Sequence, residues 1–193
     1  GGQDELVFDG GSMVFDHEGV LLARAGQFVD DVMIVDVPVP PVYRKRLLDP
    51  RGRITEALLP TVMVSSAAAA HGAELAGAVA TPLDADRELY DALVLGTRDY
   101  CRKNGFDDVV IALSGGIDST IVACIAVDAL GAAHVHGVSM PSRYSSEHSK
   151  SDAQLLAENL GIDIRTISIE PAFAAYLDML GPSFADRQPG LTY

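Results

Sequence analysis

The chain has 193 residues, 48% of them apolar, and a formal net charge of −13 at pH 7. This composition supplies enough apolar surface for a globular core. The negative charge disfavours non-specific binding to nucleic acid or to anionic membranes, because both require a positive field. We therefore expect no nucleic-acid partner and no membrane partner, and we expect anionic ligands to be held by local N–H groups.

The two cysteines, Cys101 and Cys124, form no C-x-x-C pair and no metal-ligand spacing. This pattern favours a reducing cytoplasm. The N-terminus has no initiator Met and no signal-peptide pattern, and no run of 18 uninterrupted apolar residues occurs. The sequence predicts a cytoplasmic protein and indicates that the chain is an excerpt of a longer one.

The first forty residues have the pattern of short β-strands without a helix. Leu6–Phe8 and Met13–Phe15 are β-prone runs, and a turn then leads to Val20–Ala23, which predicts a hairpin. Val32–Val37 predicts a further strand that ends at three prolines. Strands alone cannot bury their faces, so we expect this segment to be the end of a larger layered domain.

Residues 41–83 have the composition of a linker. A helix is predicted from about Asp84 to Lys103, because apolar residues recur there at spacings of three and four. Asn104-Gly105 is expected to end it. This helix opens a second domain, residues 84–193.

A strand, a glycine-rich turn and a helix follow one another at residues 109–131. Val109–Leu113 is continuously apolar and predicts a strand buried on both faces of a parallel sheet. Gly115 and Gly116 tolerate positive φ and leave the backbone open, so that N–H groups can point at an anion. A helix from about Ser119 to Leu130 adds its positive end, and Gly131 is the expected stop. The segment predicts a nucleotide-phosphate loop.

The acidic residue of this loop, Asp118, points to a metal. The loop has neither the lysine of a G-x-x-x-x-G-K-[ST] pattern nor the third glycine of G-x-G-x-x-G. A carboxylate beside a polyphosphate would repel it unless a cation lay between them, so we interpret Asp118 as a Mg²⁺ ligand. The alternative is an ordinary helix N-cap.

The remaining elements alternate between strand and helix. Val135–Met140 predicts a second strand, and the polar loop after it lies where open α/β sheets bind ligands. Ser149 and Asp152 form a capping signal for a helix that Gly161 ends, Ile164–Ile169 predicts a third strand, and Pro171 opens a helix to Leu180. The order predicts an α/β fold with a doubly wound parallel sheet and an adenine-nucleotide site at its carboxyl edge. His134 and His136 alternate along the second strand and are interpreted as structural.

Four stretches carry a family resemblance. Ser114–Ser119, SGGIDS, resembles the S-G-G-x-D-S loop of the N-type ATP pyrophosphatases, which have a HUP-like fold. The opening GGQDELVFDGGS resembles the last strands of a nitrilase-type αββα glutaminase domain. ELYDALVLGTRDYCRKNGF and GVSMPSRYSSEHSKSDAQLLAENLGI resemble the glutamine-dependent NAD⁺ synthetases. The resemblance implies that residues 1–40 are the C-terminal part of a nitrilase-type glutaminase domain and that residues 41–83 are a linker. Residues 84–193 are then the N-terminal part of an ATP pyrophosphatase domain.

What this resemblance implies is an ATP-dependent amidation of deamido-NAD⁺ to NAD⁺ through an adenylated intermediate, with ammonia from glutamine. ATP and Mg²⁺ are the expected cofactors, and a homo-oligomer is expected. Asp118 is the implied metal ligand, and the Ser114 and Ser119 hydroxyls are implied to face the pyrophosphate. The implied ATP-binding residues are Ala112, Leu113, Ser114, Gly115, Gly116, Ile117, Asp118, Ser119 and Arg143. For Arg143 a surface ion pair is the alternative.

The glutaminase residues of that family, a Glu, a Lys and a Cys, are expected upstream, and none is placed in this chain. Glu5 has no matching motif, and Cys101 and Cys124 lie on predicted helices of the other domain. Two alternative functions remain open at this point. One is another N-type ATP pyrophosphatase, of the tRNA-thiolating or GMP-synthetase-like kind, and the other is an ATP-binding module without catalysis.

Overall fold

The structure is a computed structural model, and it describes residues 1–3, 5–40, 60, 62–66 and 72–184. Contacts divide the chain into two compact units, one of Asp9–Asp84 and one of Gly1–Phe8 together with the chain from Ala85 on. The predicted domain boundaries grouped residues 1–8 with 9–40 instead, and they stay predictions. Much of the predicted linker lies outside the described residues.

The unit of Asp9–Asp84 contains the predicted hairpin. Strands β3 (Met13–Phe15) and β4 (Leu21–Arg24) pair antiparallel. The Asp16 carboxylate makes the turn between them, because its Oδ1 accepts hydrogen bonds from the amides of Glu18 and Val20, each 2.8 Å long. Local side-chain bonding of this kind is why Asp is favoured in turns.

The predicted strand at Val32–Val37 is wrong. The segment is extended, and among the described residues only Asp36 bonds to another segment. It donates its amide to the Leu75 carbonyl at 3.0 Å and accepts the Leu75 amide on its carboxylate at 2.8 Å. Val32 and Ile34 are 86% and 70% exposed. A β-prone run does not become a strand without a partner that pairs along its length.

In the other unit a short strand pair packs on a long helix. Strands β1 (Gly2–Gln3) and β2 (Leu6–Val7) pair antiparallel, and α2 (Ala85–Asn104) follows the predicted helix within one residue at each end. The Gly2 amide donates to the Asp99 carboxylate of α2 at 2.6 Å, and Lys103 donates to the Gly2 carbonyl. These bonds tie the first residues of the chain to the α/β unit.

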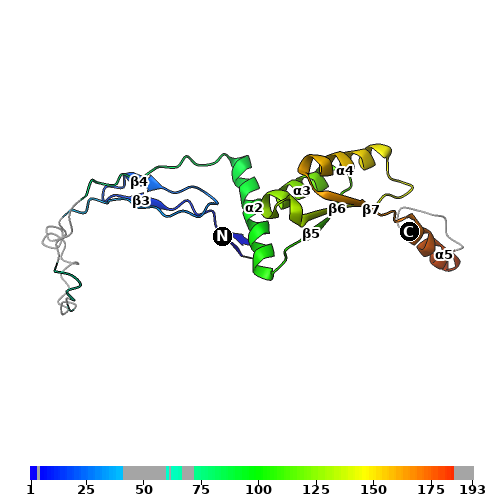
Figure 1. Cartoon of the computed structure of the whole chain (residues 1–193), viewed down its shortest axis with the longest axis horizontal. Coiled ribbons are helices and arrows are strands. Elements are labelled where there is room, and N and C mark those ends of the chain that lie inside the picture. Colours follow the sequence, from blue (N-terminus) through cyan, green and yellow to red (C-terminus); the bar gives the residue numbers. More distant parts are fainter. Residues whose placement is uncertain (4, 41–59, 61, 67–71, 185–193) are drawn as a thin grey trace. The chain divides into compact units, whose positions relative to one another are not determined.

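The three predicted parallel strands are present, which confirms the α/β class. They are β5 (Val109–Ala112), β6 (Val135–Ser139) and β7 (Asp163–Thr166), in the order β5-β6-β7 (Figure 1). The connections and end pieces are α3 (Ile117–Leu130), η2 (Ala132–His134), α4 (Glu147–Leu160), α5 (Glu170–Leu180) and η3 (Gly181–Phe184).

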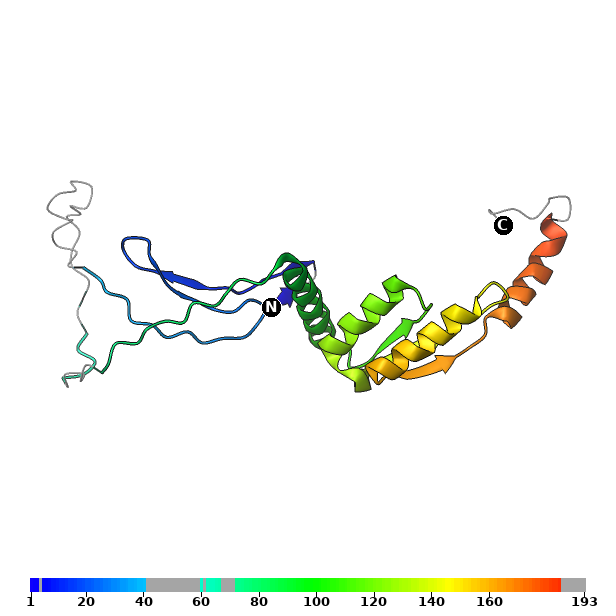
Figure 2. The ribbon, with the colours of Figure 1, turned by 90° about the horizontal axis from the view of Figure 1, so that it is seen from above.

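Helices α3 and α4 lie on the same face of this sheet (Figures 1 and 2). Small residues of both helices pack against the strands there. The buried cluster between them and the strands consists of Leu113, Ala123, Ala126, Val135, Ala153, Ala157 and Ile162. On the opposite face Val110 is 70% exposed and Ala112 is also exposed. The prediction that this strand is buried on both faces is therefore wrong for the described residues, because both crossover helices cover one face.

Two helix starts differ from their predictions. α3 begins at Ile117 instead of Ser119, because the extended Gly116 (φ −89°, ψ 162°) is its N-cap. α4 begins at Glu147, and its cap is Ser146, whose hydroxyl accepts the Ser149 amide at 3.1 Å. Serines stand three residues apart here, and the first of them takes the cap. Gly131 and Gly161 end the two helices as predicted, with φ of 90° and 68°.

Candidate functional site: a phosphate loop at the carboxyl edge of the sheet

A pocket of about 330 Å³ lies where β5 and β6 end. Parallel strands place their carboxyl ends at one edge, and ligands of open α/β sheets bind there. The pocket is lined by Ala112, Leu113, Ser114, Val138, Ser139, Met140, Pro141, Tyr144, Ser145, Ser146, Ser149 and Lys150. The predicted phosphate loop therefore contributes one wall, and the polar loop after β6 with the start of α4 contributes another.

Gly115 lets the phosphate loop pass directly against the first turn of α4. Its φ is +77°, and a Cβ built on it would lie 2.3 Å from the Ser149 carbonyl oxygen. Only glycine fits both conditions without strain. Gly116, in contrast, has an extended backbone with φ −89°. The expected tolerance of positive φ is thus used at Gly115 and not at Gly116.

Two serine hydroxyls brace the loop from within. The Ser114 amide donates to Ser119 Oγ at 3.3 Å, and Ser119 Oγ donates to the Gly116 carbonyl at 3.0 Å. The Gly116 amide donates to Ser114 Oγ at 3.2 Å, and the two hydroxyl oxygens lie 3.1 Å apart. A hydroxyl has one proton to donate. The Ser119 hydroxyl donates its proton to the Gly116 carbonyl within the loop. The Ser114 hydroxyl is therefore the one that can donate to a ligand.

The first turn of α3 presents amides without intrahelical partners. The Thr120 amide makes the first intrahelical bond, to the Gly116 carbonyl at 3.1 Å. The amides of Ile117, Asp118 and Ser119 precede it, and a helix has no carbonyl for these positions. In the described part of the chain no other carbonyl takes them. Together with the helix dipole they form an anion-binding end beside the pocket.

Asp118 is exposed on this first turn and has no hydrogen bond or ion pair within the described residues. It is not the N-cap, because Gly116 holds that position, so the alternative interpretation of Asp118 as a cap is wrong. The described residues contain no group of three or more His, Cys, Asp or Glu that could hold a metal ion. Mg²⁺ is commonly held by one or two carboxylates together with substrate phosphates and water. A single available carboxylate beside an anion-binding turn fits that mode.

Arg143 does not line the pocket, although its neighbour Tyr144 does. Its Nε donates to Glu170 Oε1 at 2.6 Å, and its guanidinium lies 5.3 Å from the centre of the Phe173 ring. The bond to Glu170 raises the pKa of Arg143, and the same bond lowers the pKa of Glu170. The predicted contact of Arg143 with the nucleotide stays a prediction.

Lys150 lines the pocket and was missed by the sequence reasoning. The loop after β6 was recognised as a ligand loop from its place at the carboxyl edge. Lys150 lies beyond it, on the first turn of α4, and no motif or periodicity in the sequence distinguishes it.

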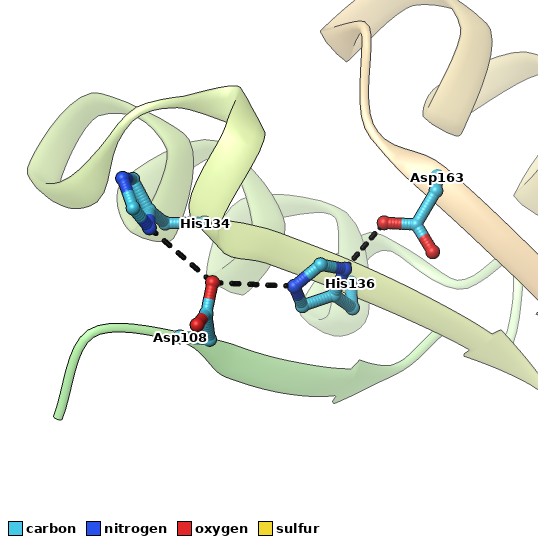
Figure 3. A network of polar contacts seen from close by, with 4 residues as sticks. All are labelled: Asp108, His134, His136 and Asp163. Carbon is cyan, nitrogen blue, oxygen red and sulfur yellow. Dashed lines mark hydrogen bonds and ion pairs between the residues drawn. The ribbon is translucent and has the colours of Figure 1, made fainter.

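His134 and His136 lie at the amino ends of the strands, away from the pocket. Figure 3 shows them joined through Asp108, whose Oδ1 lies 3.2 Å from His134 Nδ1 and 3.3 Å from His136 Nε2. His136 Nδ1 also bonds Asp163, and this bond, followed by the one to Asp108, raises the pKa of His136. Carboxylates thus engage both ring nitrogens of His136, which supports its interpretation as a structural residue.

Among the described helices none is both long enough and apolar enough to cross a bilayer. Both cysteines are unpaired, and Cys101 is buried.

Comparison with known proteins identifies relatives along the whole chain. The glutamine-dependent NAD(+) synthetase of Thermotoga maritima is 45% identical over 196 residues, which cover 100% of this chain and 34% of that protein. The enzyme of the same name from Aquifex aeolicus is 47% identical over 179 residues, covering 92% and 32%. The chain spans about a third of the length of these curated relatives.

Solved structures agree with the fold. The glutamine-dependent NAD⁺ synthetase from Acinetobacter baumannii, solved in complex with adenosine diphosphate, matches 100% of this chain and 31% of its own with a TM-score of 0.73 at 30% identity. A synthetase from Cytophaga hutchinsonii matches 53% of this chain and 24% of its own at a TM-score of 0.50 and 20% identity, which shows the fold alone. The NAD synthase family model matches residues 89–188, just over half of the chain, including the phosphate loop. The chain therefore belongs to the NAD synthase family.

Proposed function

We propose that the protein containing this chain converts deamido-NAD⁺ to NAD⁺ in an ATP-dependent amidation. The observation that carries this proposal is the loop Ser114–Ser119, braced by its serines and set against α4 at the edge of a pocket, in a member of the NAD synthase family. A carboxylate is a poor acyl donor until it is activated. A loop that binds pyrophosphate supplies that activation by stabilising the leaving group.

The proposed reaction has two steps. The nicotinate carboxylate of deamido-NAD⁺ attacks the α-phosphorus of ATP, an O–P bond forms, and pyrophosphate leaves. Ammonia then attacks the carbonyl carbon of the adenylate, and AMP leaves with the carboxylate oxygen. In the first step the unpaired amides of α3 and the Ser114 hydroxyl face the charge that grows on pyrophosphate, so they stabilise the transition state more than the ground state.

The proposed ATP contacts are the residues of the loop and the strand end before it, Ala112 to Ser119. Ala112 and Leu113 line the pocket beside the loop, and Gly115 keeps the loop in place against α4. Asp118 would hold Mg²⁺ together with the phosphates. When bound, the metal neutralises charge on the transferring group.

We also propose glutamine as the source of ammonia, because the matched relatives are named glutamine-dependent. Residues 1–40 are proposed to belong to a nitrilase-type glutaminase domain, whose Glu, Lys and Cys are assigned to no residue of this chain. We further propose that the protein is a homo-oligomer and acts in the cytoplasm.

The test measures pyrophosphate, AMP and NAD⁺ produced by protein made from its own open reading frame, with ATP, Mg²⁺ and ammonium present. Deamido-NAD⁺, xanthosine monophosphate and tRNA are supplied in separate reactions. Pyrophosphate release that needs deamido-NAD⁺ and matches NAD⁺ formation supports the proposal. Release with only one of the other substrates would replace it by a different pyrophosphatase, and ATP binding without any release would reduce the protein to a binding module.

A further inference from the structure

We propose that Glu170 and Phe173, at the start of α5, fix the loop after β6 by holding Arg143, and thereby position one wall of the nucleotide pocket. Arg143 and Glu170 are then positioning residues that act on ATP through the loop. This inference rests on the proposed nucleotide site, and it differs from a direct contact between Arg143 and ATP.

The loop 141–146 is the part of the pocket that needs to be held. Pro141, Tyr144, Ser145 and Ser146 line the cavity, whereas Arg143, in the middle of the same loop, does not. Four residues of the loop thus line the pocket, while its one cation, Arg143, bonds to α5. Whatever fixes Arg143 also fixes the residues on either side of it.

Glu170 contacts both the side chain and the backbone of Arg143. Its Oε1 accepts Arg143 Nε at 2.6 Å and also contacts Nη2, and its Oε2 accepts the Arg143 amide at 3.0 Å. A guanidinium bonded through two nitrogens has a defined orientation. The bond to the amide adds control of the main chain, which a simple surface ion pair does not provide.

Phe173 extends the contact to a residue of the pocket wall. The Arg143 guanidinium carbon lies 5.3 Å from the centre of the Phe173 ring, within the range of a cation–π contact. The Tyr144 ring meets the same ring edge to face, at a centroid distance of 6.0 Å and an interplanar angle of 82°. Tyr144 lines the pocket, so Phe173 contacts a residue of the pocket wall directly.

The end of β7 places Glu170 where it can make these bonds. The Ile169 amide and the Ser168 hydroxyl both donate to the Pro141 carbonyl, at 3.2 Å and 3.3 Å. The Glu170 amide in turn donates to Ser168 Oγ at 3.3 Å. The loop is therefore held at its first residue by a backbone amide and a serine hydroxyl, and at its third by the Glu170 carboxylate.

The partial exposure of the Arg143–Glu170 pair indicates that it holds the loop and contributes little to the stability of the whole fold. The side chains of Arg143 and Glu170 are 50% and 32% exposed, and exposed ion pairs contribute little to the stability of the whole fold. Loss of the pair should therefore loosen the loop without unfolding the protein. The quantity that changes is ATP affinity.

The test compares Glu170→Ala, Arg143→Ala and the double variant, in protein made from its own open reading frame, by ATP affinity in calorimetry and by kcat and KM for ATP. We expect each single change to weaken ATP binding about 5- to 10-fold while kcat changes less than about twofold. The double variant should be no worse than the worse single variant, because both remove the same unit. Glu170→Gln keeps an acceptor for the Arg143 amide and should lose less than Glu170→Ala.

Asp91→Ala is the matched control, because it removes an exposed Arg–carboxylate pair of α2, Arg87–Asp91 at 2.9 Å, that does not line the pocket. It should leave ATP affinity unchanged. If Arg143→Ala weakened ATP binding far more than Glu170→Ala, and the two losses multiplied in the double variant, Arg143 would contact ATP directly. That result would overturn the inference. Unchanged ATP affinity in all variants would also overturn it. A wild-type protein that does not bind ATP would instead refute the proposed function.

Discussion

Replacing Gly115 by alanine would disturb the contact between the phosphate loop and α4. Gly115 has a φ of +77°, and the added Cβ would lie 2.3 Å from the Ser149 carbonyl oxygen and 2.9 Å from the Ser149 Cα. Both atoms belong to the backbone of the first turn of α4, so neither can rotate away. The loop must then either separate from α4 or distort it.

Two contributions set the size of the effect. An L-residue held at positive φ costs about 1–2 kcal/mol. Forcing a methyl group into a packed contact adds about 1–3 kcal/mol. We expect Gly115→Ala to lose about 2–5 kcal/mol in total, divided between the free energy of unfolding and the free energy of ATP binding.

Two glycines serve as controls. Gly161 has a φ of +68° with nothing within 4 Å of an added Cβ, so Gly161→Ala should cost only the backbone strain. Gly116 has a negative φ, and its added Cβ would meet only the Ser114 hydroxyl at 3.3 Å, so Gly116→Ala should cost less than about 1 kcal/mol of stability.

The assays are urea unfolding followed by circular dichroism and ATP binding followed by calorimetry. The reasoning predicts that Gly115→Ala exceeds Gly161→Ala in the summed loss. If Gly115→Ala cost no more stability than Gly161→Ala and bound ATP as the wild type does, the loop would not be held against α4 in the way described.

The remaining predictions concern the metal ligand and the histidine cluster. Asp118→Ala should leave the melting temperature unchanged and lower Mg²⁺-dependent NAD⁺ synthesis at least about a hundredfold, because a ligand that offsets pyrophosphate charge is lost; near-wild-type synthesis would refute the metal role. Bonds to Asp163 and Asp108 raise the pKa of His136, so their stabilisation is complete below the ordinary pKa of 6.5 and disappears as pH rises through the raised value. Asp163→Asn should therefore lower the melting temperature more at about pH 5.5 than at about pH 9, and an equal loss at both would contradict this.

Local signals predicted the elements that carry the site. The apolar run at Val109, the two glycines of the loop and Gly131 each act on their own backbone, and the structure has the strand, the turn and the helix end there. Helix α2 was equally readable, because its apolar spacing continues over 20 residues. Short-range chemistry of this kind is independent of what lies across the fold.

Features that depend on distant partners were not predicted. The close approach of Ser149 to Gly115 comes from α4, which is distant in the sequence, so the sequence did not show which of the two glycines is the constrained one. The exposure of Val110 depends on both helices covering the other face. The surface ion pair considered for Arg143 is present, but its partner Glu170 lies at the start of α5, which comes to the loop only through β7. Lys150 lines the pocket because the first turn of α4 lies beside the ends of β5 and β6. Tertiary contacts determine each of these features, and the hydrophobic periodicity of the sequence does not predict tertiary contacts.

The measurement that tests the central claim most directly is the exchange of labelled pyrophosphate into ATP without ammonia. If the loop Ser114–Ser119 stabilises pyrophosphate while deamido-NAD⁺ is adenylated, exchange should occur only when deamido-NAD⁺ and Mg²⁺ are both present. It should also fall at least about a hundredfold in Asp118→Ala. Exchange that proceeds without deamido-NAD⁺, or NAD⁺ synthesis by a protein that shows no exchange, would contradict the account.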